Sequence, residues 1–122
     1  MFARMTILQL NPERIDDGIE IYRTSVVPEA KKQKGYRGVC LLADRASGKS
    51  ISVTFWRTEK DAIANEESLY YQEQLVKFIS LLAGPMIREG YKVSVHCLET
   101  EAGAKPKPKA EKKQAVKKRG KK

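Results

Sequence analysis

The sequence has few of the residues that build metal centres and disulfide frameworks. Its 122 residues include two cysteines, Cys40 and Cys97, and one histidine, His96. Two thiols cannot hold together a small secreted domain, and their distance from the single imidazole gives no zinc-ligand spacing. We therefore expect no bound metal and a cytoplasmic location in which both thiols are reduced and buried.

Long apolar runs are also missing. The strongest one lies around residues 81–83, which is far short of the ~20 residues that a membrane span needs. The first residues lack the apolar core of a secretory signal, and neither a Walker A loop nor a GxGxxG motif occurs. These absences argue against a membrane protein, a secreted protein and the common nucleotide-binding folds.

The net charge of +9 is concentrated at one end of the chain. Residues 103–122 contain ten lysines or arginines and one acid, Glu111, whereas residues 1–102 contain 14 basic and 14 acidic residues. A neutral body is not a basic nucleic-acid reader. The last residues are rich in Lys, Pro and Ala and cannot bury enough apolar surface to fold. We predict a folded domain over residues 1–99 and a disordered basic tail over residues 100–122.

Apolar periodicity predicts a βαββαβ order in the body. The expected elements are strands over 2–9, 35–44, 50–57 and 88–99, a helix over 11–26, and a helix from residue 58 to about residue 82 that restarts at Ser68. Pro28 is expected to interrupt the first helix before a short helical segment over 29–34. The order predicts an α+β, ferredoxin-like fold, in which an antiparallel sheet of strand order 4-1-3-2 carries both helices on one face.

Several short segments carry a resemblance to a known family. They are Arg23–Pro28, Lys34–Gly38, Thr54–Glu59, Tyr70–Glu73 and Gly84-Pro85. Through these segments the body, residues 1–99, resembles the antibiotic biosynthesis monooxygenase domains of the dimeric α+β barrel superfamily. The resemblance implies a homodimer in which two sheets pack as a barrel, with a pocket between the sheet and the helices of each subunit. It also implies cofactor-free oxidation of a small aromatic molecule.

One branch of that superfamily degrades haem, and this sequence departs from its pattern. That branch has an Asn in the first strand, a Trp early in the second helix and an axial His about ten positions later. The corresponding positions here are Met5, Asn65 and Leu75. We therefore expect no haem and no other cofactor.

Candidate site residues follow from the more polar phase of the strands, which contains Arg4, Thr6, Ser52, Thr54, Trp56, Ser94 and His96. As catalytic residues we predict Arg4, Trp56 and His96. Trp56 would stack on a planar substrate, and Arg4 or His96 would stabilise a phenolate or enolate. As substrate-binding residues we predict Tyr22, Thr54 and Tyr71. Two alternatives stay open: the polar phase lines a dimer interface, and Tyr22 is a core residue with a satisfied hydroxyl.

A second function comes from the tail. Its lysines can neutralise phosphates without reading bases, and its lack of aromatic residues excludes stacking on single strands. The alternative to an enzyme is a non-enzymatic dimeric module that the tail tethers to nucleic acid. A solubilising or idle extension is an equally open reading of these residues.

For the dimer we expect an outer sheet face that carries Phe2, Leu8, Trp56 and Leu98 and is covered by the partner.

Overall fold

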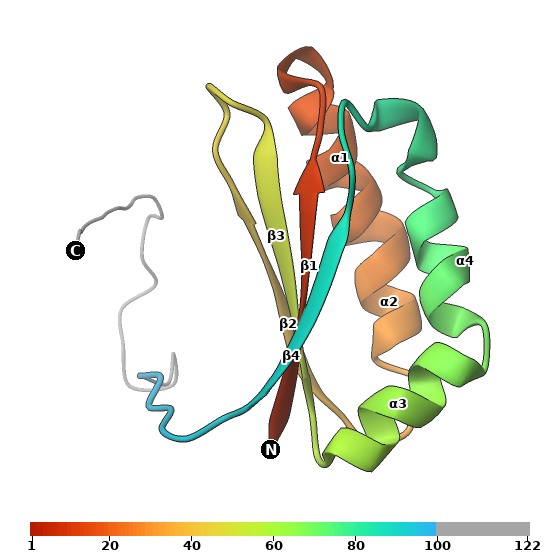
Figure 1. The fold of residues 1–122 in the computed structure, drawn as a ribbon, viewed down its shortest axis with the longest axis vertical. Coiled ribbons are helices and arrows are strands. Elements are labelled where there is room, and N and C mark those ends of the chain that lie inside the picture. The colour runs from red at the N-terminus through yellow and green to blue at the C-terminus, as the bar shows by residue number, and fades with distance from the viewer. Residues whose placement is uncertain (100–122) are drawn as a thin grey trace.

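The computed structural model describes residues 1–99, and its centre is a four-stranded antiparallel sheet (Figure 1). The strands are β1 (Phe2–Gln9), β2 (Tyr36–Ala43), β3 (Lys49–Trp56) and β4 (Ile87–Lys92). Their order is β2-β3-β1-β4, so β1 lies between β3 and β4. This is the predicted strand order, and the α+β ferredoxin-like class is confirmed. The predicted tail over residues 100–122 lies outside the described residues.

The first helical layer runs without interruption from Pro12 to Ala30. It comprises η1 (Pro12–Arg14), α1 (Ile15–Ile21), the π-helical turn η2 (Tyr22–Val26) and α2 (Val27–Ala30). The expected break at Pro28 is wrong. In the π-turn the N–H of Val27 donates to the carbonyl of Tyr22, five residues back. Pro28 then falls in the first turn of α2, where a missing N–H is tolerated.

The second helical layer comprises α3 (Glu59–Glu67), α4 (Tyr70–Val76) and η3 (Ile79–Leu81). Thr58 caps α3, because its hydroxyl accepts a hydrogen bond from the N–H of Asp61 at 3.1 Å. The left-handed backbone of Leu69, with φ of 75°, separates α3 from α4. All helices cover one face of the sheet and leave the other face open (Figure 1).

Strand register decides which residues the helices cover. Every second residue of β1 is buried, namely Phe2, Arg4, Thr6 and Leu8. Trp56 of β3 pairs with Phe2 of β1. The expectation that Phe2, Leu8 and Trp56 form the outer face is therefore wrong, since their exposed fractions are only 9 %, 3 % and 1 %. The open face instead carries the other phase: Ala3, Met5, Ile7, Cys40, Leu42, Ile51, Val53, Phe55, Ile87 and Tyr91.

The last strand is shorter than predicted. β4 ends at Lys92, and a final bond joins the N–H of Val93 to the carbonyl of Met1 at 2.9 Å. Residues 93–99 then leave the sheet on its open side (Figure 1). Both thiols are exposed in this chain, so the expectation of buried thiols is wrong. Cys40 belongs to the open-face phase of edge strand β2, and Cys97 lies beyond β4.

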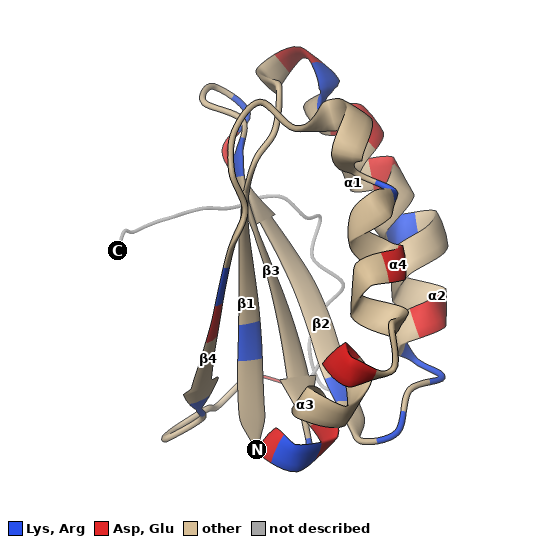
Figure 2. Cartoon of the chain, turned by 45° about the vertical axis from the view of Figure 1, so that its right-hand side comes forward, with Lys and Arg blue, Asp and Glu red and all other residues tan. Residues whose placement is uncertain are grey.

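Charged residues lie mainly on the helices, on β4 and at the ends of the sheet, and a basic position also interrupts β1 (Figure 2). Among the described residues, no helix has the length and apolar character that crossing a bilayer requires.

Gly35 fixes the turn that leads into β2. Its φ is +83°, and a Cβ there would overlap the carboxylate of Asp61, which pairs with Arg57 at 3.1 Å. We expect Gly35→Ala to lower the free energy of unfolding by about 2–4 kcal/mol, through left-handed strain and the displaced ion pair. The measurement is urea unfolding followed by Trp56 fluorescence. Gly38→Ala is the control, since its Cβ would meet only a Phe55 ring carbon at 3.7 Å. Equal midpoints for the two variants would contradict this account.

Candidate functional site

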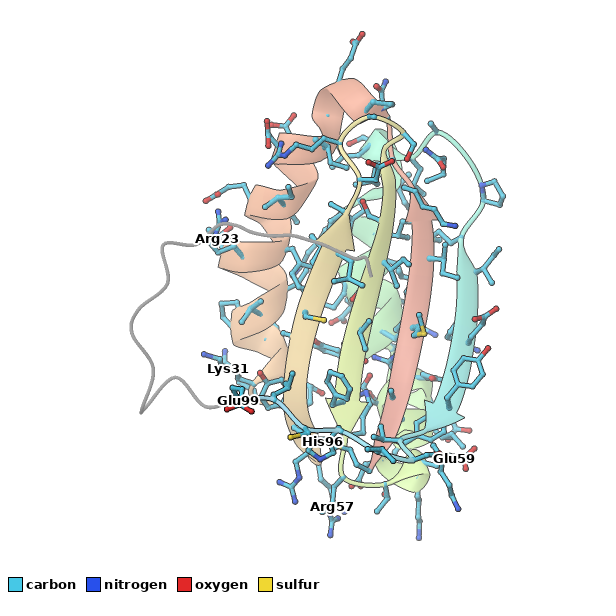
Figure 3. The ribbon with its side chains drawn as sticks, turned by 90° about the vertical axis from the view of Figure 1, so that its left-hand side faces the viewer. Arg23, Lys31, Arg57, Glu59, His96 and Glu99 are labelled. Atoms are coloured by element: carbon cyan, nitrogen blue, oxygen red, sulfur yellow. The ribbon has the colours of Figure 1, made fainter. Side chains whose placement is uncertain are left out.

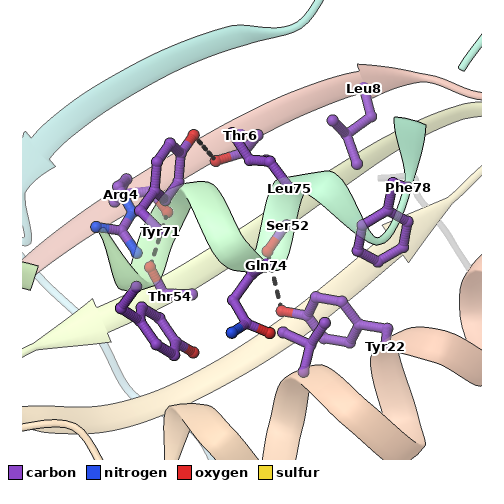
Figure 4. A pocket seen from close by; sticks show the side chains of 12 residues that line it. Arg4, Thr6, Leu8, Tyr22, Ser52, Thr54, Tyr71, Gln74, Leu75 and Phe78 are labelled. Atoms are coloured by element: carbon purple, nitrogen blue, oxygen red, sulfur yellow. Dashed lines mark hydrogen bonds between the residues drawn. The ribbon is translucent and has the colours of Figure 1, made fainter. Parts of the chain in front are cut away.

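A cavity lies between the sheet and the two helical layers (Figure 4). Its volume is about 40 Å³. Strands β1 and β3 supply its floor, and η2, α4 and the turn after α4 supply its walls. The lining residues are Arg4, Thr6, Leu8, Tyr22, Val26, Ser52, Thr54, Tyr70, Tyr71, Gln74, Leu75 and Phe78. Buried positions of a core are mostly apolar, so the row of hydroxyls and one cation under the helices marks a candidate site rather than simple packing.

Arg4 is the only charged residue of the lining. Its exposed fraction is 3 %, and its guanidinium carbon lies 5.1 Å from the ring centre of Trp56 and 4.4 Å from that of Tyr71. Nη1 donates to Glu66 at 3.3 Å and to the carbonyl of Ala62 at 3.4 Å. Burial lowers the pKa of Arg4 and Glu66 opposes this shift, so the group stays a cation.

The remaining donors of Arg4 are free for a ligand. Within residues 1–99, its Nε and Nη2 make no hydrogen bond to protein. A guanidinium offers five N–H donors in a fixed fork that suits carboxylates and other oxyanions. Two aromatic faces and one carboxylate therefore hold the cation while part of its fork is left for the cavity.

Three side chains contact Tyr71. Its hydroxyl shares a 2.8 Å hydrogen bond with Thr6, and the guanidinium carbons of Arg4 and Arg88 lie 4.4 Å and 5.2 Å from its ring centre. Glu66 contacts both arginines, at 3.3 Å and 3.7 Å. The cluster thus carries two cations and one anion, which leaves a net positive charge beside the cavity.

Tyr22 places a second hydroxyl in the cavity from the π-helical turn. The hydroxyl donates to the carbonyl of Cys40 at 3.3 Å and shares a 3.0 Å hydrogen bond with Ser52. Burial raises the pKa of Tyr22 to about 12, and burial likewise raises the pKa of Tyr70 to about 12. Both phenols are therefore neutral near pH 7, where they serve as hydrogen-bonding groups and not as bases.

Among residues 1–99, no Asp, Glu or His lines the cavity, so the described lining offers no general base. The site can bind, orient and stabilise an anion, but a proton must be lost to solvent or before binding. Within residues 1–99, no three His, Cys, Asp or Glu side chains are grouped so as to hold a metal ion.

The predicted site residues divide into three groups. Arg4, Thr54, Tyr22 and Tyr71 line the cavity together. Trp56 does not reach the cavity; it stacks on Arg4 from behind and donates its indole N–H to Thr54 at 2.9 Å. His96 lies beyond β4, is exposed, and sits on the open side of the sheet (Figure 3).

The polar phase of β1 and β3 faces the helices, so the alternative in which it lines a dimer interface is wrong for these strands. Tyr22 was predicted either to bind substrate or to be a core residue. It belongs to the core cluster, and its hydroxyl also reaches the cavity.

Sequence reasoning found Tyr71 on α4 but missed two other residues of that helix. Gln74 and Tyr70 line the cavity, and Gln74 is buried in a helix whose polar residues otherwise face solvent. Their spacing from Tyr71 was the available signal: Gln74 follows it by three positions, on the same helix face. Glu66 and Arg88 gave no such signal, because only the fold brings Glu66 to Arg4 and Arg88 to Tyr71.

Comparisons with known proteins agree with this fold. No family model matches the chain. Two uncharacterized proteins of Mycobacterium tuberculosis strain H37Rv are similar to it: Rv2557 is 38 % identical over 69 residues, which are 57 % of this chain and 31 % of the relative, and Rv2558 is 38 % identical over 58 residues, which are 48 % and 25 %. The chain thus spans less than a third of the length of these curated relatives.

Solved structures extend the likeness to most of the body. A Streptomyces coelicolor monooxygenase from the gene ActVA-Orf6, in complex with nanaomycin D, superposes with a TM-score of 0.65 at 14 % identity, covering 81 % of this chain and 92 % of that one. A Bordetella bronchiseptica protein, provisionally named an antibiotic biosynthesis monooxygenase, gives 0.64 at 19 % identity, covering 77 % and 97 %. The chain has the fold of the antibiotic biosynthesis monooxygenases, as its sequence segments indicated.

Two tyrosines of the cavity, Tyr22 and Tyr70, provide a test of its geometry. The folded-state pKa values of these two phenols, about 12, exceed the ordinary 10.0. The stability from these neutral phenols is therefore complete below pH 10 and is lost as pH rises toward 12. In a tyrosinate absorption titration, Tyr22→Phe and Tyr70→Phe should each remove one residue from the late step near pH 12. Loss from an earlier step would show that these hydroxyls are solvated.

Proposed function

We propose that residues 1–99 form a monooxygenase-like domain that binds a small aromatic molecule as its phenolate or enolate anion and oxidises it without a cofactor. The observation that carries the proposal is Arg4, a buried cation with unused donors in a cavity otherwise lined by neutral groups. The fold shared with antibiotic biosynthesis monooxygenases supports the same conclusion.

Arg4 would act on the charge of the bound anion. Inside a cavity that admits little water, an oriented cation stabilises an oxyanion more strongly than it would in solution. The hydroxyls of Tyr22, Thr54 and Tyr71 would position the ring and its oxygens. Trp56 would act as a positioning residue, because it contacts Arg4 and not the cavity.

For the reaction of the substrate with O₂, stabilising the substrate anion is the main contribution that the protein has to make. Oxygen accepts an electron readily from an electron-rich anion, so stabilising the anion raises the fraction of substrate that can react. A suitable substrate has a methylene that lies between two aryl or carbonyl groups. When this methylene is oxidised to a carbonyl, O₂ supplies the new oxygen atom. The substrate gives up its two hydrogens and all four electrons, and the second oxygen atom leaves as water. No external reductant enters this balance.

Entry of a ring requires the wall formed by α4 to open. A cavity that accepts benzene has a volume on the order of 150 Å³, and this one has about 40 Å³. Tyr70 is half-buried, and within the described residues its hydroxyl makes no hydrogen bond. It also follows the helix break at Leu69. Rotation of Tyr70, with Gln74, would enlarge the cavity without disturbing the sheet.

The ligand test uses 4-nitrophenolate, a coloured monocyclic anion, titrated against the full chain at mildly alkaline pH. We expect a shifted absorption band on binding and a loss of affinity of about 10- to 100-fold in Arg4→Met, which removes charged hydrogen bonds. Arg23→Met is the matched control, since Arg23 is an exposed arginine on the helical layer with its own acidic partner, Glu20.

Neutral 4-nitroanisole separates a lost charge from a lost fold. It should bind wild type and Arg4→Met alike. Oxygen consumption with anthrone, whose methylene lies between two aryl groups, then tests the oxidation. Equal binding of 4-nitrophenolate by wild type and Arg4→Met, or none by either, would overturn the proposal.

We also propose a homodimer formed through the open face of the sheet. That face carries the apolar residues Leu42, Ile87 and Tyr91, which are 52 %, 50 % and 54 % exposed. Together with the apolar phase of β1 and β3 they form a continuous patch, and large exposed apolar patches mark interaction surfaces. The resemblance to dimeric α+β barrels points the same way.

The basic tail supports a second candidate function, attachment of the dimer to nucleic acid in the cytoplasm. Ten basic residues against one acid lie within residues 103–122. Two such tails on one dimer would bind a polyanion with higher avidity than one. The observation concerns composition alone, so it implies contact with phosphates and no reading of bases.

The tail makes its own prediction. In gel shifts, the full chain should bind DNA and RNA without sequence preference, and affinity should fall by ~10³ between low and physiological salt if about six phosphates are contacted. Deletion of residues 103–122 should abolish binding while thermal unfolding of the body stays unchanged. Sequence-selective binding by the truncated body, or no binding by the full chain at low salt, would each refute tethering by the tail.

A further inference from the structure

A second and larger cleft lies at the end of the molecule where β3 leads into α3. One of its walls is the turn that follows α2, and the other is one side of α3 (Figure 1). Its volume is about 510 Å³, which is within the range of small-molecule sites. The cleft shares no lining residue with the cavity between the sheet and the helices. Its lining includes Gln33, Lys34, Arg57, Lys60, Asp61 and Asn65.

Hydrogen bonds join the two walls of the cleft. The N–H of Arg57, the residue after β3, donates to the carbonyl of Gly35 at 2.7 Å. Across the cleft, Nδ2 of Asn65 donates to Oε1 of Gln33 at 3.2 Å. Nε2 of Gln33 in turn donates to the carbonyl of Glu29 at 3.2 Å. The cleft is therefore preformed, which spares a ligand the cost of ordering its walls.

These bonds leave two buried acceptors without a hydrogen-bond donor. A carbonyl only accepts, so the carbonyl of Glu29 fixes Nε2 of Gln33 toward itself and Oε1 toward Asn65. Asn65 is 6 % exposed, and within residues 1–99 its Oδ1 accepts no hydrogen bond. Oδ2 of Asp61, a residue 7 % exposed, forms a 3.1 Å ion pair with Arg57 that lacks hydrogen-bond geometry. Such acceptors favour a ligand that carries O–H or N–H donors.

The charge of the lining indicates what else the ligand carries. Lys34, Arg57 and Lys60 supply three cations, and Asp61 is the one anion among the lining residues, which leaves a net charge of +2. Within residues 1–99, neither lysine has an ion pair. The lining also includes Thr58, the N-cap of α3, and a helix N-terminus favours anions. A phosphate monoester, with a charge of about −1.5 to −2 near pH 7, matches this lining.

We propose that this cleft binds a phosphate monoester of a small polyol. Lys34, Arg57 and Lys60 hold the phosphate, in which the lysines act as point charges and the guanidinium forms directed hydrogen bonds. A hydroxyl of the polyol donates to Asn65 and supplies the hydrogen bond that its Oδ1 lacks within the described chain. This inference goes beyond the proposed oxidation, because the two sites share no lining residue and either can fail without the other.

The test titrates the full chain with glycerol 3-phosphate and follows the NMR shift of each amide. Residue resolution is needed because the basic tail also attracts phosphates. Saturable shifts are expected in residues 57–68, including the side-chain amide of Asn65. Lys34→Gln/Lys60→Gln should weaken this binding by at least about 10-fold, since two charge-assisted contacts are lost. The matched control is Lys31→Gln/Lys49→Gln, which removes the same charge from exposed positions outside the cleft and should bind like wild type. Both double variants should keep the wild-type thermal unfolding, because all four lysines are exposed.

Methyl phosphate, a monoester without hydroxyl donors, tests the organic part of the ligand. Wild type should bind it about 2- to 10-fold more weakly than glycerol 3-phosphate, the difference expected for one neutral hydrogen bond. Asn65→Ala should lose this preference and still bind methyl phosphate like wild type. Shifts confined to residues 103–122, or equal binding by the two double lysine variants, would overturn the site. Equal binding of the two monoesters by wild type would overturn the polyol phosphate as its ligand.

Discussion

Burial of the Arg4 guanidinium is the constraint around which the rest of the site is arranged. A charge moved out of water costs several kcal/mol unless it is paired and hydrogen-bonded. Here the compensation comes from Glu66, the carbonyl of Ala62 and the faces of Trp56 and Tyr71. These partners come from three separate elements: α3, β3 and α4. Holding one cation in place thus ties α3 and α4 of the second helical layer to the sheet.

The residues that hold Arg4 in place are distinct from the groups that face the cavity. Trp56 and Glu66 contact the cation on sides turned away from the cavity, and Tyr71 is fixed by Thr6 and by a second arginine. The cation is therefore preorganised before any ligand arrives, which is the condition under which electrostatic stabilisation is most effective. The absence of a carboxylate or imidazole from the lining keeps the charge from being neutralised within the cavity.

Much of the fold could be predicted from local patterns, because alternation and caps are properties of short segments. Asn11 and Thr58, the first residues of the two predicted helical ranges, are the residues whose side chains cap the helices. Alternation also identified Arg4, Thr54 and Trp56 as one phase. It could not tell which phase the helices cover, because both phases of β1 contain apolar residues, and the expected outer face was consequently reversed. Long-range packing of Trp56, Phe2 and Ala62 decides which phase of the strands the helices cover.

The candidate site was predictable only where strand phase determines it. Tyr22 and Tyr71 were found through helix periodicity, and Gln74 shares that signal. His96 was grouped with Arg4 because the last strand was expected to continue to residue 99, whereas β4 ends at Lys92. The pairing of β1 with β4 ends at Phe2 and Lys92, with one further bond from the N–H of Val93 to the carbonyl of Met1. Pairing with a neighbouring strand, and not the alternation of residues 93–99 alone, decides where β4 ends.

The central position of β1 has a consequence for synthesis of the chain on the ribosome. β1 is made first but lies between β3 and β4, so one of its edges stays unpaired until residues 87–92 have emerged. At about 5–20 residues per second, that interval lasts roughly 4 to 16 s. Throughout it a strand of eight residues, FARMTILQ, has a free edge. Arg4 sits in the middle of that strand, and a charge at such a position discourages aggregation of nascent chains. The residue that later holds the site together therefore protects the chain before the site exists.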